Sequence, residues 1–227
     1  MDLKFNPTNE QNFELEGRGR YNFVAHKGHI DKLVSEGHYA EACEYRYEAF
    51  QLLAEALPED EPMPLKWEHA NSHAAMTILY GSAIDHFRIG DLEMTMAQLE
   101  MLLECDPEDH FETVNLLALC YIATEEWDAY DDLAIDLTDK SGEAVTARLW
   151  AKFRTDKALD SSLLTLLKSK HKALYTELIA QEHPDDEAFH RDITSEHPSK
   201  AAEAREWWLL TEPLWSEFPE FIEALRR

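Results

Sequence analysis

The sequence is poor in the residues that interrupt or cross-link a chain. Its 227 residues include 7 glycines, 9 prolines and 3 cysteines, while 44% are hydrophobic. That apolar content excludes a disordered chain, which cannot bury enough apolar surface to fold. Cys43, Cys105 and Cys120 form no Cys-x-x-Cys pair. They therefore predict neither a disulfide framework nor a zinc ribbon, and they suit a reducing cytoplasm.

Long apolar runs are also missing. No stretch approaches the roughly 18 apolar residues of a membrane span, and residues 1–11 contain no apolar run preceded by basic residues. We therefore expect no transmembrane segment, no signal peptide and a cytoplasmic location.

Motifs of catalysis are absent as well. The sequence contains no Gly-x-Ser-x-Gly, no P-loop, no Gly-x-Gly-x-x-Gly and no Cys–His signature. It therefore gives no basis for nucleophilic or nucleotide chemistry. We expect no enzyme activity, no catalytic residues and no cofactor.

The charge is strongly acidic and unevenly distributed. A net charge of -25 disfavours binding to nucleic acid and to anionic lipid, since both would be repelled. Residues 91–139 contain 15 Asp or Glu and no Lys or Arg, whereas residues 140–172 contain 8 Lys or Arg and 3 acids. We interpret this as a solvated surface with compensation between neighbouring helices. The alternatives are a basic partner, separate partners for the two blocks, or a homo-dimer in which the blocks meet.

Apolar residues recur every three to four positions, which predicts an all-α chain. Glycine, proline and N-capping residues divide the pattern into helices. Gly90 ends one helix and Asp91 caps the next. Asp106 caps a further helix, which has Pro107 at its first position. We expect helices over residues 39–57, 67–89, 92–105, 107–123, 127–137, 143–155, 161–181 and 200–211, and after Pro219. Residues 1–17 are expected to be extended and poorly packed. Residues 58–64 are expected to be a loop, and residues 182–198 a loop with at most one helical turn.

The residues 37–42 (Gly-His-Tyr-Ala-Glu-Ala) and the 17-residue spacing from Gly90 to Pro107 resemble the tetratricopeptide repeat, a helix-turn-helix unit of about 34 residues. Trp127 and Ala129 are similar to the aromatic and alanine positions of a further unit, without its glycine. The resemblance covers about residues 22–155. It implies a right-handed superhelical stack of antiparallel helix pairs over residues 18–227, with divergent helices from about residue 156 and an extended segment at residues 1–17.

The resemblance also implies a binding groove on the first helices of the pairs. Counting from Gly90 and Pro107 places these residues in it: Thr77, Tyr80, Ile84, Phe87, Phe111, Val114, Asn115, Ala118, Arg148 and Lys152. Aromatic and apolar side chains with two cations at one end suit an extended or helical peptide, with a carboxylate as one option. The implied function is a protein- or peptide-binding adaptor. A small acidic chaperone of a secreted partner and a purely self-associating module are the alternatives within the same architecture.

Histidines offer a further alternative, a metal-dependent enzyme. His69 and His73 are four residues apart on a predicted helix, a spacing that can present two imidazoles to one metal. His183, His190 and His197 recur every seven residues in an acidic loop. The first group has no third ligand nearby, whereas Asp185, Asp186 and Asp192 lie close to the second. We interpret the first as a polar helix face and the second as solvated histidines, both without a metal. Trp207, Trp208 and Trp215 are expected to pack the last helices.

Overall fold

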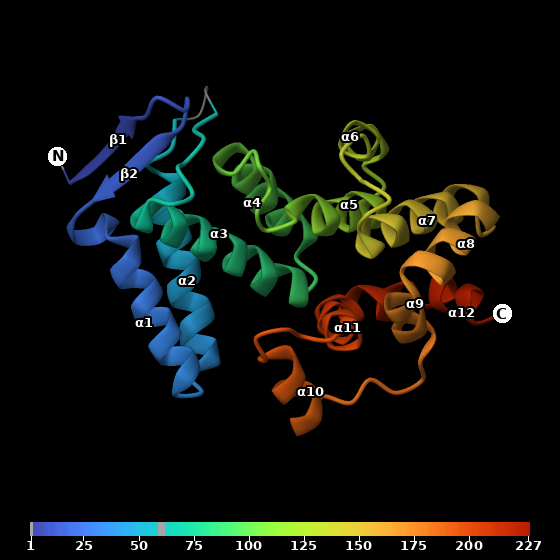
Figure 1. The fold of residues 1–227 in the computed structure, drawn as a ribbon. Helices are drawn as coiled ribbons and strands as arrows, with labels where there is room; N and C mark the ends of the chain where they lie inside the picture. The colour runs from blue at the N-terminus through green and yellow to red at the C-terminus, as the bar shows by residue number, and fades with distance from the viewer. Residues whose placement is uncertain (1, 59–61) are drawn as a thin grey trace. The chain divides into compact units, whose positions relative to one another are not determined.

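The computed structural model describes residues 2–58 and 62–227 (Figure 1). The chain divides into two compact units, Met1–Thr113 and Val114–Arg227. The loop expected over residues 58–64 lies partly outside the described residues. The chain is mainly α-helical, as predicted, with the addition of a small antiparallel sheet near the N-terminus.

Unit 1 contains a β-hairpin followed by helices. Its elements are β1 (Leu3–Pro7), β2 (Phe13–Gly17), a 3-10 turn (Gly19–Tyr21), α1 (Phe23–Ser35), α2 (Tyr39–Ala54), α3 (Ala70–Arg88) and α4 (Leu92–Cys105). Helix α3 packs against α1 and α2, and α4 packs against α3.

The elements from there to the C-terminus are α5 (Thr113–Thr124), α6 (Trp127–Leu133), α7 (Gly142–Asp156), α8 (Ser161–Lys170), α9 (Lys172–Ile179), α10 (Glu187–Ile193), α11 (Lys200–Glu217) and α12 (Pro219–Arg226).

The prediction of an extended N-terminal segment is confirmed for Leu3–Pro7 and Phe13–Gly17, but the prediction that this segment packs poorly is wrong. Strands β1 and β2 pair in an antiparallel register that sets Phe5 opposite Leu15. Leu15 is 0% exposed, and Leu3, Phe5 and Phe13 pack against the same core. Alternating side chains of a strand share one face, and here that face is apolar. The hairpin is therefore part of unit 1.

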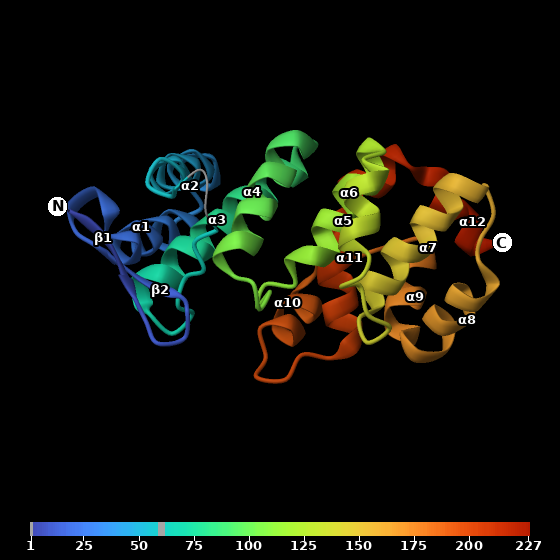
Figure 2. The same cartoon turned by 90° about the horizontal axis from the view of Figure 1, so that it is seen from above.

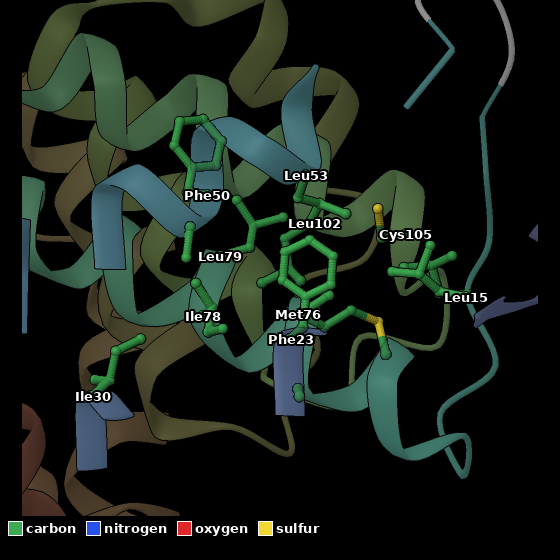
Figure 3. Packing of buried hydrophobic residues seen from close by; sticks show 14 of the residues in the cluster. Leu15, Phe23, Ile30, Phe50, Leu53, Met76, Ile78, Leu79, Leu102 and Cys105 are labelled. Atoms are coloured by element: carbon green, nitrogen blue, oxygen red, sulfur yellow. The ribbon is translucent and has the colours of Figure 1, made fainter. Parts of the chain in front are cut away.

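The core of unit 1 joins the hairpin to the first helices (Figure 3). Phe23, Met76 and Leu79 are fully buried, and Leu53 and Leu102 bring α2 and α4 into the same cluster. Each such side chain stabilises the fold by roughly 1.5–3 kcal/mol relative to an exposed position.

Asn71 connects three parts of this unit through its buried side chain. Its Oδ1 accepts hydrogen bonds from the N–H groups of Phe23 (2.7 Å) and Val24 (3.3 Å) at the start of α1. Its Nδ2 donates to the carbonyls of Leu15 (2.9 Å) and Tyr21 (3.1 Å). One amide thus satisfies four backbone groups and places the first turns of α1 and α3 side by side.

The two glycines that carry the repeat resemblance, Gly37 and Gly90, both lie where the chain reverses between helices. Gly37 lies between α1 and α2 with φ +80°, and Gly90 lies between α3 and α4 with φ +77°. Only glycine adopts this left-handed region without a steric cost. Asp91 caps α4 as predicted, since its side chain accepts a hydrogen bond from the N–H of Met94.

Several predicted helix boundaries are wrong, and side-chain hydrogen bonds account for two of them. Helix α3 starts at Ala70 because His69 caps it by accepting from the N–H of Ser72. Helix α5 starts at Thr113 and not at Pro107, because the Asp106 carboxylate folds residues 106–112 into turns. Helix α6 ends at Leu133, the helix expected over 161–181 breaks at His171, and α11 continues through Pro213. The segment 182–198, expected to be a loop with at most one helical turn, contains the 7-residue helix α10.

Unit 2 is built around aromatic residues of α7, α11 and α12. The ring of Trp150 is 0% exposed and makes edge contacts with Trp215 (5.1 Å between centroids) and Phe218 (5.2 Å). Trp208 and Trp215 are buried, which confirms their predicted packing role. Helix α8 packs against α7 and α9, and α9 packs against α11 and α12 (Figure 2). Across the residues described, no helix is long and apolar enough to cross a membrane.

Candidate functional site

The candidate site is a row of five rings in unit 1, which we call the aromatic row. Its rings come from the segment before α3, from α3 itself and from the α4–α5 connection. They belong to Trp67, His73, Tyr80, His110 and Phe111. The two imidazoles are exposed, whereas the other three rings are partly buried.

Trp67 is held in place by backbone hydrogen bonds of its neighbours. The N–H of Phe13 donates to Pro64 and the N–H of Lys66 donates to Phe13, both at 2.8 Å. The N–H of Leu65 donates to Cys105 at the end of α4, at 2.7 Å. The segment before α3 is therefore attached to β2 on one side and to α4 on the other, and this fixes the position of the indole.

His110 and Phe111 are positioned by two aspartates in the α4–α5 connection. The buried carboxylate of Asp106 accepts from the backbone N–H of His110 (2.8 Å) and from its Nδ1 (2.6 Å). Asp109, at φ +53°, accepts from the N–H of Thr113 through Oδ1 at 2.6 Å and so caps α5. These turns present the His110 and Phe111 side chains to α3 and to Trp67.

The rings of the row are in contact with one another. The imidazole of His110 stacks on the Trp67 indole, with centroids 4.1 Å apart and an interplanar angle of 11°. Phe111 meets Trp67 edge-on at 5.2 Å and stacks with Tyr80 at 5.0 Å, while His73 lies 4.4 Å from Trp67. Offset stacked and edge-to-face pairs of this kind are the favoured aromatic geometries.

The electrostatic environment of the row is acidic. The hydrogen bond from His110 to Asp106 raises the pKa of the imidazole, and the charges of Asp106, Glu108 and Glu68 act in the same direction. The carboxylate of Glu108 is 85% exposed and lies 3.5 Å from His110 Nε2. Protonated His110 on the indole face is a cation–π pair. The surface around the row therefore favours positive charge.

The groove residues predicted from sequence divide between the two units. Unit 1 contains Thr77, Tyr80, Ile84, Phe87 and Phe111. The structure brings Tyr80 and Phe111 together, and Thr77 and Ile84 are partly buried on the same helix as Tyr80. The Thr77 hydroxyl donates to the carbonyl of His73 at 2.8 Å. Phe87 is 1% exposed and offers no surface for a ligand.

The remaining predicted groove residues lie in unit 2. Asn115 and Ala118 are buried on α5, where Val114 is partly buried. Arg148 forms an ion pair with Asp139 at 2.5 Å, and Lys152 is exposed on α7.

The histidines singled out from sequence lie in different surroundings. His69 Nδ1 accepts from the N–H of Ser72 and caps α3, so the prediction that His69 lies with His73 on one helix is wrong. His190 lies 2.9 Å from Asp185, and His197 is exposed. In the chain outside residues 1 and 59–61, no three His, Cys, Asp or Glu side chains are arranged to hold a metal ion.

His183 is not solvated, contrary to expectation, because it belongs to a buried cluster in unit 2. Its Nδ1 lies 2.7 Å from Oε1 of Glu177, both side chains are 9% exposed, and its ring stacks on Trp208 at 4.0 Å. Arg205 donates to both carboxylate oxygens of Glu177 and to the carbonyl of Pro184. Burial raises the pKa of Glu177, but the hydrogen bonds from Arg205 and His183 outweigh it and hold this pKa below its ordinary value. The cluster fixes the connection after α9.

Sequence reasoning missed Trp67, His73 and His110 as neighbours of Tyr80 and Phe111. A signal was present for Trp67, because Pro62 and Pro64 place it directly after a segment that cannot be helical. No family model, no curated protein and no solved structure matches the chain.

Proposed function

We propose that this chain is a protein-binding adaptor of helical-repeat type, which binds a segment of another protein across the aromatic row. The observation that carries the proposal is the contact between Tyr80 and Phe111. The sequence assigned both to one surface, and their rings stack at 5.0 Å and continue into Trp67 and His73. Aromatic side chains supply large contact areas at low cost in conformational entropy.

A tetratricopeptide-like stack in unit 1 is part of the proposal. Helix α3 packs against both α1 and α2, and the side chain of Asn71 at the start of α3 bonds to the start of α1. The glycine turns at Gly37 and Gly90 support the stack as well. These contacts are expected when the helix pair α3–α4 stacks on the pair α1–α2, because neither pair can bury its apolar face alone.

The surroundings of the aromatic row favour a partner segment with a basic residue next to an apolar one. Glu68 and Glu108 are exposed beside the rings. Lys66, the cation nearest in sequence to Trp67, lies 3.5 Å from Glu14. Electrostatic complementarity then selects a positively charged segment.

The proposal is tested by comparing two variants as baits. Phe111→Ser removes a ring from the row, whereas Phe189→Ser removes a partly buried ring from α10 of unit 2. We expect the partner captured by the wild-type chain to be lost with Phe111→Ser and retained with Phe189→Ser. Equal capture by both variants, with circular dichroism showing both folded, would place the binding surface elsewhere.

A further inference from the structure

Unit 2 carries two small patches of opposite charge next to each other. The acidic patch lies on α6 and the α6–α7 connection and consists of Asp131, Asp132 and Asp136. The basic patch lies at the end of the α6–α7 connection and at the α8–α9 junction and consists of Lys140, Lys170 and Lys172. All six side chains belong to exposed residues.

His171 connects the chain segments that carry the two patches. Its Nε2 donates to the carbonyl of Asp139 at 3.1 Å, and its Cβ lies 3.1 Å from where a Cβ on Gly142 would be. Lys170 and Lys172 flank this histidine, and Lys140 follows Asp139. The α6–α7 connection, which contains Asp136 and Lys140, thus meets the α8–α9 junction, where Lys170 and Lys172 lie on either side of His171.

Other charges of the same segments are already compensated within the chain. Arg148 pairs with Asp139, and Arg154 pairs with Glu125, each at 2.5 Å. Lys168 lies over the ring of Tyr175 at 5.0 Å. By contrast, the six residues of the two patches make no ion pair with any described residue. Their charges remain available to a partner.

A large apolar side chain stands in the acidic patch. Ile135 is 84% exposed, between Asp132 and Asp136. An isolated exposed isoleucine needs no explanation by itself. With Asp132 and Asp136 close to it in the sequence, however, it offers an apolar contact next to charged ones, as in an interface with an apolar centre and a polar rim.

We propose that this face binds a second copy of the chain. A two-fold axis brings the acidic patch of each copy onto the basic patch of the other, as an isologous contact requires. Complementary charge identifies this occupant, because the chain itself carries both halves of the match. Each copy has a net charge of -25, but at about 0.15 M salt the Debye length is about 8 Å. Salt therefore screens the repulsion between distant charges of the two copies. The attraction between charges in contact across the interface is screened less.

The test uses sedimentation of the full chain and of two charge-reversed variants. Variant one, Lys170→Glu with Lys172→Glu, makes both patches negative. Variant two, Asp131→Lys with Asp132→Lys, makes both patches positive. We expect the wild type to dimerise, each variant alone to be monomeric, and an equimolar mixture to form a heterodimer. All these substitutions are at exposed positions, and circular dichroism checks that each variant is folded.

Ile135→Asp tests the apolar centre separately and should raise the dimer dissociation constant by about tenfold. A wild-type chain that stays monomeric at every concentration reached would overturn the proposal. So would a mixture of the two folded variants that stays monomeric, or a wild-type dimer that both variants leave intact.

Discussion

The imidazole of His110 lies parallel to the indole of Trp67, with ring centroids 4.1 Å apart. The same imidazole donates to the buried carboxylate of Asp106. This relationship connects the segment before α3 to the α4–α5 connection, and both segments contribute rings to the aromatic row. The protonated form of His110 strengthens each contact, because it is a cation beside a carboxylate and over an aromatic face.

The raised pKa of His110 predicts a stability that depends on pH. A group whose pKa is higher in the folded state stabilises the fold fully below its unfolded pKa, about 6.5 for histidine. That contribution is lost as the pH rises through the folded value. We expect the urea midpoint to fall over this range in the wild type and less in His110→Gln. Equal pH dependence in both proteins would show that His110 makes no such contribution.

Glu177 in unit 2 predicts a dependence of stability on pH that has the opposite sign. Its pKa is held below the ordinary value by Arg205 and His183. A carboxylate with a lowered folded pKa stabilises the fold above its unfolded pKa, about 4.3, and loses this contribution as the pH falls through the folded value. Glu177→Gln should therefore flatten the acid branch of the stability curve. Glu206→Gln, at an exposed position of α11, is the matched control and should leave that branch unchanged.

Asn71→Ala should be among the most destabilising substitutions in unit 1. It leaves the N–H groups of Phe23 and Val24 and the carbonyls of Leu15 and Tyr21 without their partner. Each buried group left unpaired costs about 1–3 kcal/mol, so we expect a loss of at least about 3 kcal/mol in chemical denaturation. Asn22→Ala removes a cap at the exposed N-terminus of α1 and should cost only about 1 kcal/mol. Similar losses for the two variants would refute the central role of Asn71.

Two glycines predict opposite effects of the same substitution. A Cβ on Gly28 in α1 would meet nothing within 4 Å, so Gly28→Ala should stabilise the chain by roughly 0.5–1 kcal/mol. A Cβ on Gly142 would lie 2.9 Å from Cδ2 of Leu174 and 3.1 Å from Cβ of His171. Gly142→Ala should therefore destabilise α7 against α8 and α9. Thermal unfolding of both variants checks the difference in sign, and a shift in the same direction would contradict it.

The parts of the structure that sequence predicted are those set by local backbone chemistry. Gly37 and Gly90 reverse the chain because few other residues tolerate their φ. The paired placement of Tyr80 and Phe111 followed from counting helical positions between Gly90 and Pro107. These features depend on short stretches of sequence, so a repeat pattern is sufficient to find them.

The parts that sequence missed depend on contacts between distant residues. Helical periodicity placed Trp67 inside a helix, but His69 caps α3 and leaves Trp67 outside it. Proline is common at the first position of a helix, and Pro107 was predicted there. The carboxylate of Asp106 instead accepts hydrogen bonds from His110, and α5 begins only at Thr113. The backbone of Leu15 is held by residues more than fifty positions away, because Ser72 Oγ accepts from its N–H and Asn71 Nδ2 donates to its carbonyl.

Site-specific photo-cross-linking tests the central claim, that a partner binds across the aromatic row, most directly. A photoreactive residue at position 73 replaces the exposed ring of His73, and one at position 212 replaces the exposed Glu212 of α11 as the control. The account predicts that a partner segment cross-links from position 73, that mass spectrometry finds a basic residue in that segment, and that Phe111→Ser abolishes the cross-link. Cross-linking from position 212 but not from position 73, with both proteins folded, would contradict it.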